Sequence, residues 1–109
     1  MASEVLGVKL EATLSNTERV LINGVNGHTY TILSITLCET AGAAETFDLY
    51  IDDGGGGTDY EIYSDQPLGA NQTFEHTGRI VLVDEDHLCA ATASSANVDV
   101  VVSYLDQTR

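Results

Sequence analysis

Apolar and polar residues alternate along most of this 109-residue sequence, and that period of two limits its fold more than any other feature. No stretch of about eleven residues or more repeats apolar side chains at the helical spacing i, i+3, i+4, i+7. Short β-prone segments recur instead, separated by turn residues such as glycine, asparagine and serine. We therefore expect an all-β fold: a two-sheet antiparallel sandwich of the jelly-roll or Ig-like type, with about eight to nine short strands.

The middle of the chain carries the strongest strand signals. Residues 28–39 form the longest β-prone run, with apolar residues on both faces, which predicts a central strand covered on both sides. Residues 47–51 form an amphipathic strand, and the glycine-rich residues 52–59 after it indicate the tip of a hairpin. The only proline, Pro67, lies in residues 66–71, so we expect a connection between the sheets there instead of strand.

The N-terminal region has two interpretations. Residues 1–17 are either an extended arm, which adds a strand to a neighbouring chain, or the first strand of the sandwich, half-buried with one wet face. Residues 18–109 form the sandwich domain in both cases. The candidate partner contacts here are the apolar side chains of Val5, Val8, Leu10 and Leu14.

Two tyrosines are further contact candidates. The alternation predicts that Tyr50 and Tyr63 lie on the polar faces of their strands, and tyrosine is favoured at contact surfaces. A protein or glycan contact is one interpretation. The other is a set of cross-strand aromatic pairs that stabilises the hairpin.

The charge of the chain excludes several partners. Four Lys and Arg stand against seventeen Asp and Glu, for a formal net charge of −13. Such a chain repels nucleic acids and anionic lipid surfaces, so we expect neither nucleic acid nor membrane as a partner. Residues 20–78 contain no Lys or Arg, which argues against a phosphate-binding loop at the glycine run.

The sequence predicts no catalytic, cofactor-binding or metal-binding residues. The three histidines His28, His76 and His87 lack the short spacing of metal ligands, and no GxSxG motif is present. The acidic turn 84–86 is interpreted as solvated. For the acidic hairpin around residues 52–61 the sequence leaves two interpretations, a solvated tip or a weak cation site.

The two cysteines, Cys38 and Cys89, are predicted to be reduced and buried. Both lie in apolar company, and two cysteines are too few for a disulfide scaffold.

The order of segments carries more information than any single residue. A strand at 28–36 precedes an Ala- and Thr-rich break at 40–44, the strand Phe47-Asp48-Leu49-Tyr50-Ile51 and a glycine-rich tip. The loop segment Leu68-Gly69-Ala70-Asn71-Gln72-Thr73 leads to the strand Gly78-Arg79-Ile80-Val81-Leu82, an acidic turn, and an Ala- and Ser-rich break before a valine strand. In this order, over about 20–105, the chain resembles a family of small β-sandwich virion proteins of tailed bacteriophages. The family's usual Pro-Ala-Gly turn is replaced here by residues 23–27.

The resemblance implies a non-enzymatic structural protein of a tailed-phage particle, made in the host cytoplasm and located in the virion. It implies most directly a capsid decoration (cement) protein that docks on the major capsid protein or other virion proteins and stabilises the shell. The alternative is a collar-, tail- or fibre-associated adhesin or adaptor that contacts the host surface. The small size of the domain also favours a homo-oligomer, a dimer or trimer.

Overall fold

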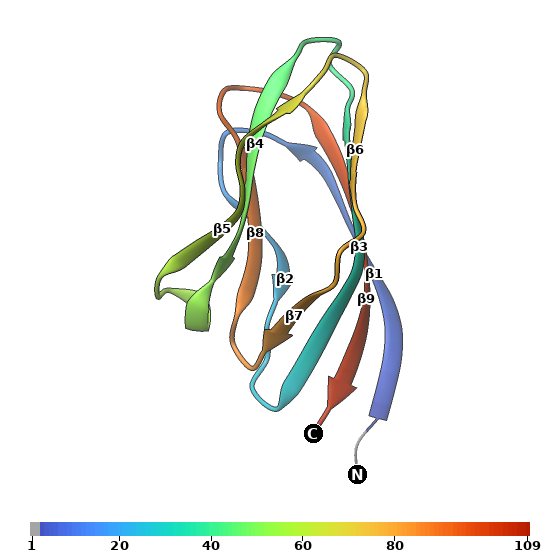
Figure 1. Ribbon diagram of the computed structural model, residues 1–109, viewed down its shortest axis with the longest axis vertical. Helices are drawn as coiled ribbons and strands as arrows, with labels where there is room; N and C mark the ends of the chain where they lie inside the picture. The colour runs from blue at the N-terminus through green and yellow to red at the C-terminus, as the bar shows by residue number, and fades with distance from the viewer. Residues whose placement is uncertain (1–2) are drawn as a thin grey trace.

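The computed structural model describes residues 3–109 and folds them into two antiparallel sheets that pack face to face (Figure 1). One sheet has the order β1 (Ser3–Leu14), β9 (Val98–Thr108), β3 (His28–Glu39) and β6 (Thr73–His76), with β7 (Ile80–Val83) also paired to β3. The other has the order β2 (Arg19–Asn23), β8 (His87–Thr92), β4 (Glu45–Asp52) and β5 (Asp59–Leu68). A single 3₁₀ turn, Asp53–Gly55, follows β4 in the described residues.

The predicted all-β sandwich is confirmed, with nine strands in residues 3–109. The strands pair in a nested order from the chain ends inward: β1 with β9, β2 with β8, β3 with β6 and β7, and β4 with β5. This nesting is that of a jelly roll. None of residues 3–109 forms a helix long and apolar enough to cross a membrane.

The hydrophobic core lies between the two sheets. Its buried aliphatic members are Leu14, Leu21, Ile22, Ile32, Ile35, Leu37, Leu49, Leu68, Leu82, Leu88, Ala90, Val98, Val100 and Val102. The strands supply them in alternation, which matches the period of two in the sequence. The prediction of an amphipathic strand at 47–51 is confirmed, since Phe47 and Leu49 are buried and Ile51 packs against the core.

Strand β3 is central, as predicted, but the expectation that both of its faces are covered is wrong. Ile32 pairs with Tyr104 and Ser34 pairs with Ser103, so Leu33 is an extra residue in the ladder. This β-bulge shifts the alternation by one position, and Ile35 therefore enters the same core as Ile32. The outer face of β3 stays open, and Leu33 is 38% exposed.

The prediction of a connection at 66–71 is half wrong. Strand β5 continues through Pro67, which pairs with Thr46 of β4, and the crossing to the other sheet begins only after Leu68. A proline fits there because β5 is an edge strand, so its missing N–H breaks no second ladder.

A buried carboxylate organises the end of the sandwich where the chain crosses between sheets. Glu39, at the end of β3, is 1% exposed. Its Oε2 accepts the backbone N–H of Ala41 at 2.8 Å, and its Oε1 accepts those of Gly42 at 2.9 Å, Ala43 at 3.1 Å and Asn71 at 3.0 Å. These bonds lower the pKa of the Glu39 carboxyl. The bond from Asn71 has the largest effect, and the bonds from residues 41–43 add to it. Burial acts in the opposite direction and raises the pKa, but the net shift is downward. Glu39 therefore joins two separate loops, the turn after β3 and the crossing before β6.

Candidate interaction surfaces

The two outer faces of the sandwich differ in chemistry. On the five-stranded sheet, the ladder places Leu6 of β1 beside Leu105 of β9, then Thr31 of β3, then Val81 of β7. The next ladder row toward the other end is Val8, Ser103 and Ser34, and beyond it lie Leu10, Val101 and Thr36. None of these side chains is charged, and the row of Leu10 ends at Glu75 on the edge strand β6. We call this surface the apolar face; its exposed apolar members are Leu6, Val8, Leu10, Val81, Val83 and Val101.

The two faces of strand β1 have the opposite orientation to the one expected for a half-buried strand of this sequence. Its apolar side chains face solvent, with Leu6 74%, Val8 56% and Leu10 67% exposed. The charged side chains of Lys9 and Glu11 lie on the opposite, inner side, toward β2. The expected burial of the Val8 and Leu10 face is therefore wrong for this chain by itself.

The inner side of β1 is occupied in a way that explains this orientation. The Tyr104 ring lies across Gly7, where an added Cβ would come 2.6 Å from the ring Cζ. Farther along, the Arg19 guanidinium of β2 donates to the Glu11 carboxylate at 2.9 Å. Since β1 runs along the edge of its sheet, its inner side meets this polar rim instead of the aliphatic core.

The four apolar contact candidates of the N-terminal region do not share one surface. Val8 and Leu10 lie on the apolar face, whereas Val5 is 59% exposed on the inner side of β1. Leu14 is fully buried, because the ladder shifts between Glu11 and Leu14 and turns it into the core. From Ser3 onward the region pairs with β9 of its own chain, and residues 1 and 2 lie outside the described part.

The outer face of the four-stranded sheet is acidic. Asp48 of β4 and Asp59 and Glu61 of β5 lie on it, and Asp65 donates its backbone N–H to Asp48 Oδ1 at 2.7 Å. Strands β4, β5 and β8 contain no Lys or Arg. Burial, reinforced by the charges of Asp48, Asp59 and Asp65, raises the pKa of the Glu61 carboxyl. We call this surface the acidic face.

Removing the Glu61 charge is expected to stabilise the protein at neutral pH. Because its pKa is higher in the folded chain, the fold favours the protonated form, and ionisation costs stability as the pH rises through the folded value. Glu61→Gln should therefore raise the thermal midpoint at pH 7 by a small amount, with no gain below about pH 4 and a smaller gain in high salt. Scanning calorimetry at both pH values measures it. Glu75→Gln, an exposed change in the other sheet, is the matched control, and an equal shift in that variant would refute the account.

Tyr50 lies on the acidic face, as predicted, but it is only 8% exposed. Its hydroxyl donates to the Glu18 carboxylate. Burial and this bond raise the pKa of the Tyr50 hydroxyl. The ring covers the acidic face locally and offers little surface for a partner.

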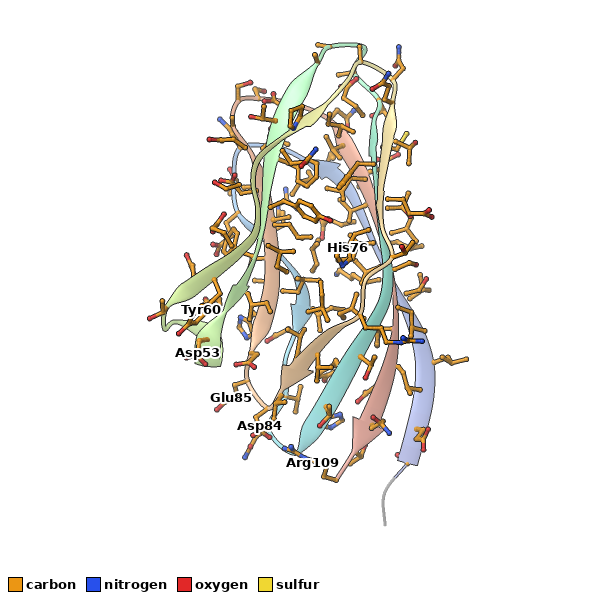
Figure 2. The ribbon with its side chains drawn as sticks, in the orientation of Figure 1. Asp53, Tyr60, His76, Asp84, Glu85 and Arg109 are labelled. Carbon is orange, nitrogen blue, oxygen red and sulfur yellow. The ribbon has the colours of Figure 1, made fainter. Side chains whose placement is uncertain are left out.

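The strand face predicted for Tyr63 is wrong. Leu49 pairs with Tyr63 and Tyr50 pairs with Glu61, so Ile62 is an extra residue that reverses the alternation of β5. Tyr63 therefore points between the sheets, where its ring lies 4.9 Å from that of Phe74. Its hydroxyl is 2.7 Å from His76 Nδ1, and His76 lies between the sheets in Figure 2.

Three of the acidic groups weighed for chemistry bind backbone or side-chain groups of the same chain. Asp84 accepts the backbone N–H of Gly27 at 3.0 Å and also the Arg109 guanidinium, and Asp86 accepts the N–H of Gly54 at 3.1 Å. At the hairpin tip Asp52 accepts the N–H of Gly56 at 2.9 Å. No group of three or more His, Cys, Asp or Glu side chains in residues 3–109 is arranged to hold a metal ion. Figure 2 shows the acidic turn, with Asp84 and Glu85, and the hairpin tip, with Asp53, in the lower half of the molecule.

The two cysteines are free and lie on opposite outer faces, Cys38 on β3 and Cys89 on β8. Packed sheets are about 10 Å apart, beyond the roughly 7 Å between Cα atoms that a disulfide allows, so the folded chain cannot join them. Burial, with the nearby charges of Glu18, Asp52 and Asp59, raises the pKa of the Cys89 thiol to about 12. Cys38 is only half-buried, unlike the prediction.

Sequence reasoning missed most of the apolar face. Leu6, Val81, Val101 and Leu105 come from three strands, and only the ladder shows that they share a surface. One signal was present in the sequence: β1 alternates so that its larger apolar residues oppose Lys9 and Glu11, and in an edge strand such a pattern fits either orientation.

Comparisons with known proteins show the fold. No family model matches the sequence, and no curated protein sequence matches it. Among solved structures, the chain is similar to one from Bacillus endospore appendages, a family of disulfide-linked pili, with a TM-score of 0.59 and 11% identity over 98% of this chain and 88% of that one. It is similar to a chain of the capsid of Helicobacter pylori bacteriophage KHP30, with a TM-score of 0.56 and 13% identity over 100% and 99% of the two chains.

A third similar chain comes from the infectious bursal disease virus particle, with a TM-score of 0.57 and 8% identity. The likeness covers 97% of this chain and 35% of that one, so this chain spans about a third of its length. At these identities the comparisons establish the architecture alone: a two-sheet β-sandwich that extends over nearly the whole chain.

Proposed function

We propose that this protein is a non-enzymatic structural component of a tailed-phage particle, a decoration protein that docks on the outer surface of the capsid. The observation that carries the proposal is the division of its surface into an apolar face, with no charged side chain at its centre, and an acidic face. Exposed apolar side chains gathered on one face of a small domain mark a contact with another protein. The likeness to the bacteriophage capsid chain, over essentially the full length of both chains, supports placing that contact in a virus particle.

Decoration stabilises a shell by mass action in this proposal. A protein that binds the assembled shell and not its dissociated subunits lowers the free energy of the assembled state by RT ln(1 + [L]/Kd) at each site. At a free concentration one hundred times Kd this is about 2.7 kcal/mol per site, and many sites act together. The acidic face suits an outward position, since like-charged particles repel one another.

Particles made without this protein are therefore expected to release their DNA at lower temperature than complete particles, and also in low salt that complete particles withstand, because weaker screening raises the repulsion between DNA phosphates. Adding the purified chain back should raise the temperature of DNA release toward that of complete particles. The rise should depend on the concentration of the chain and reach a plateau when the sites are filled. Dye-detected DNA release during heating measures this. Equal heat stability with and without the protein, at full occupancy of the complete particles, would overturn the decoration role.

A collar-, tail- or fibre-associated adhesin or adaptor is the competing assignment. It differs in stoichiometry, because a tail component is present in a handful of copies and a decoration protein in hundreds. Removing a tail component is expected to abolish attachment to host cells and leave the heat stability of the head unchanged.

A further inference from the structure

We infer that the apolar face is the contact between two copies of this chain, which pack their five-stranded sheets against each other across a two-fold axis. This inference rests on the proposed function, which makes the apolar face a contact with another protein. It adds that this other protein is a second copy of the same chain.

The charge distribution favours a second copy on this face. Each chain carries a net charge of −13, so two copies repel wherever their acidic surfaces meet. On β1, β9 and β3, the three central ladder rows of the apolar face, which begin at Leu6, Val8 and Leu10, contain no charged side chain. Among the nearest carboxylates, those of Glu4 and Asp99 lie beyond the first and last of these rows, and that of Glu75 lies at the side edge, on β6 beside Thr36. Two copies can therefore approach closely over these rows of β1, β9 and β3 with no charged side chain between them.

The face is also large enough for a dimer. From Glu4 to Ala12, β1 is about 30 Å long at 3.3–3.4 Å per residue, and the strands β1, β9, β3 and β7 span about 15–20 Å at their usual spacing. This gives a flat area of roughly 500 Å², and exposed side chains add to it. A standard interface buries about 800 Å² on each partner, so the face is of the right order.

The relief of the face is self-complementary. Leu6 is its most exposed side chain, at 74%. Near the other end of the face, a hollow of about 230 Å³ is lined by Leu10, Glu11, Ala12, Asp99, Val100 and Val101. Leu6 and Leu10 are equally spaced along β1 on either side of Val8. Consider a two-fold axis that lies between the five-stranded sheets of the two copies, runs across the strands and passes over Val8 of β1. This axis places Leu6 of each copy over the hollow of the other.

The first test is the mass of the wild-type chain in solution. Sedimentation velocity from about 1 µM to about 1 mM is expected to show a species of twice the 11.6 kDa chain. Added salt should strengthen this dimer, because it screens the charge repulsion between the copies while apolar contacts hold them. A wild-type chain that stays monomeric throughout, in low and high salt, would overturn the inference.

The second test places one charge at the centre of the contact. Val8→Lys buries two opposed ammonium groups on the axis, and we expect the dimer dissociation constant to rise at least about 100-fold. Tyr60→Lys is the matched control, since it adds the same charge at a side chain of similar exposure, 58% against 56%, on the hairpin of the other sheet. The control should remain dimeric. A dimer that survives Val8→Lys contradicts the proposed face.

Binding to particles separates this inference from the function. A dimer that fails to bind particles refutes the decoration role and keeps the inference. A monomer whose particle binding is lost in Val8→Lys refutes the inference and keeps the function, because another virion protein then covers the face. Thermal unfolding of Val8→Lys, expected to stay cooperative because Val8 is exposed, confirms that each result comes from a folded chain.

Discussion

Replacing Phe47 by alanine is expected to remove about 3–5 kcal/mol from the free energy of unfolding. Phe47 is 1% exposed and stands on β4, and its ring lies 5.3 Å from that of Phe74 on β6 of the opposite sheet and 6.2 Å from that of Tyr63. The three rings join the sheets, so truncation leaves a cavity that neither sheet can close by itself. Since domains of this kind are stable by about 5–15 kcal/mol, the variant should be close to unfolding at room temperature.

Urea unfolding followed by tyrosine fluorescence or circular dichroism measures this loss. Tyr60→Ala is the control, because it removes an aromatic ring from the neighbouring strand at a position that is 58% exposed. It should change the free energy of unfolding by no more than about 0.5 kcal/mol. A loss below about 1 kcal/mol in Phe47→Ala would show that the aromatic cluster does not bind the sheets together.

Replacing Glu39 by glutamine is expected to cause the largest loss of stability outside the hydrophobic core. The charged carboxylate accepts four backbone N–H groups from two loops, whereas a glutamine amide presents one oxygen and turns an NH₂ donor toward the other N–H groups. Donors left unpaired in a buried site carry the full penalty of their desolvation. The crossing from β5 to β6 should therefore open, with faster hydrogen exchange at Asn71 and at residues 41–43.

The pH dependence of the stability difference between wild type and Glu39→Gln identifies the role of the Glu39 charge. The pKa of Glu39 is lower in the folded chain than its usual value of 4.5, so its stabilisation is complete above pH 4.5 and is lost as the pH falls through the folded value. The difference in unfolding midpoint between wild type and Glu39→Gln should be greatest near pH 7 and shrink below about pH 4. Glu85→Gln, an exposed change of the same chemistry, should give no such difference. A pH-independent loss in Glu39→Gln would contradict the role of the charge.

The sequence was sufficient for the strands because alternation is a local property. The strands predicted at 28–39, 47–51 and 78–82 overlap β3, β4 and β7, and β3 is central as expected. Local alternation cannot show a bulge. The extra residues Leu33 in β3 and Ile62 in β5, and the shifted ladder before Leu14, each reverse the direction in which the next side chains along the strand point. These shifts account for the errors at Tyr63, at Leu14 and on the outer face of β3.

The candidate surfaces were predictable only in part. Val8 and Leu10 were identified from their apolar character, but their partners on the apolar face come from strands far along the chain and meet them only in the folded sheet. Glu39 was missed because its sequence neighbours resemble an ordinary small-residue turn. Its role depends on Asn71, thirty-two positions away, whose N–H reaches it only after the chain has crossed between the sheets.

The number of copies of this chain in purified particles tests whether it is a decoration protein. Quantitative mass spectrometry with an isotope-labelled standard of the chain, normalised to the major capsid protein of the same particles, gives the number of copies. We expect hundreds of copies per particle, with density for them on the outside of the shell in a cryo-EM reconstruction. A handful of copies at the tail, or none in purified particles, would contradict it.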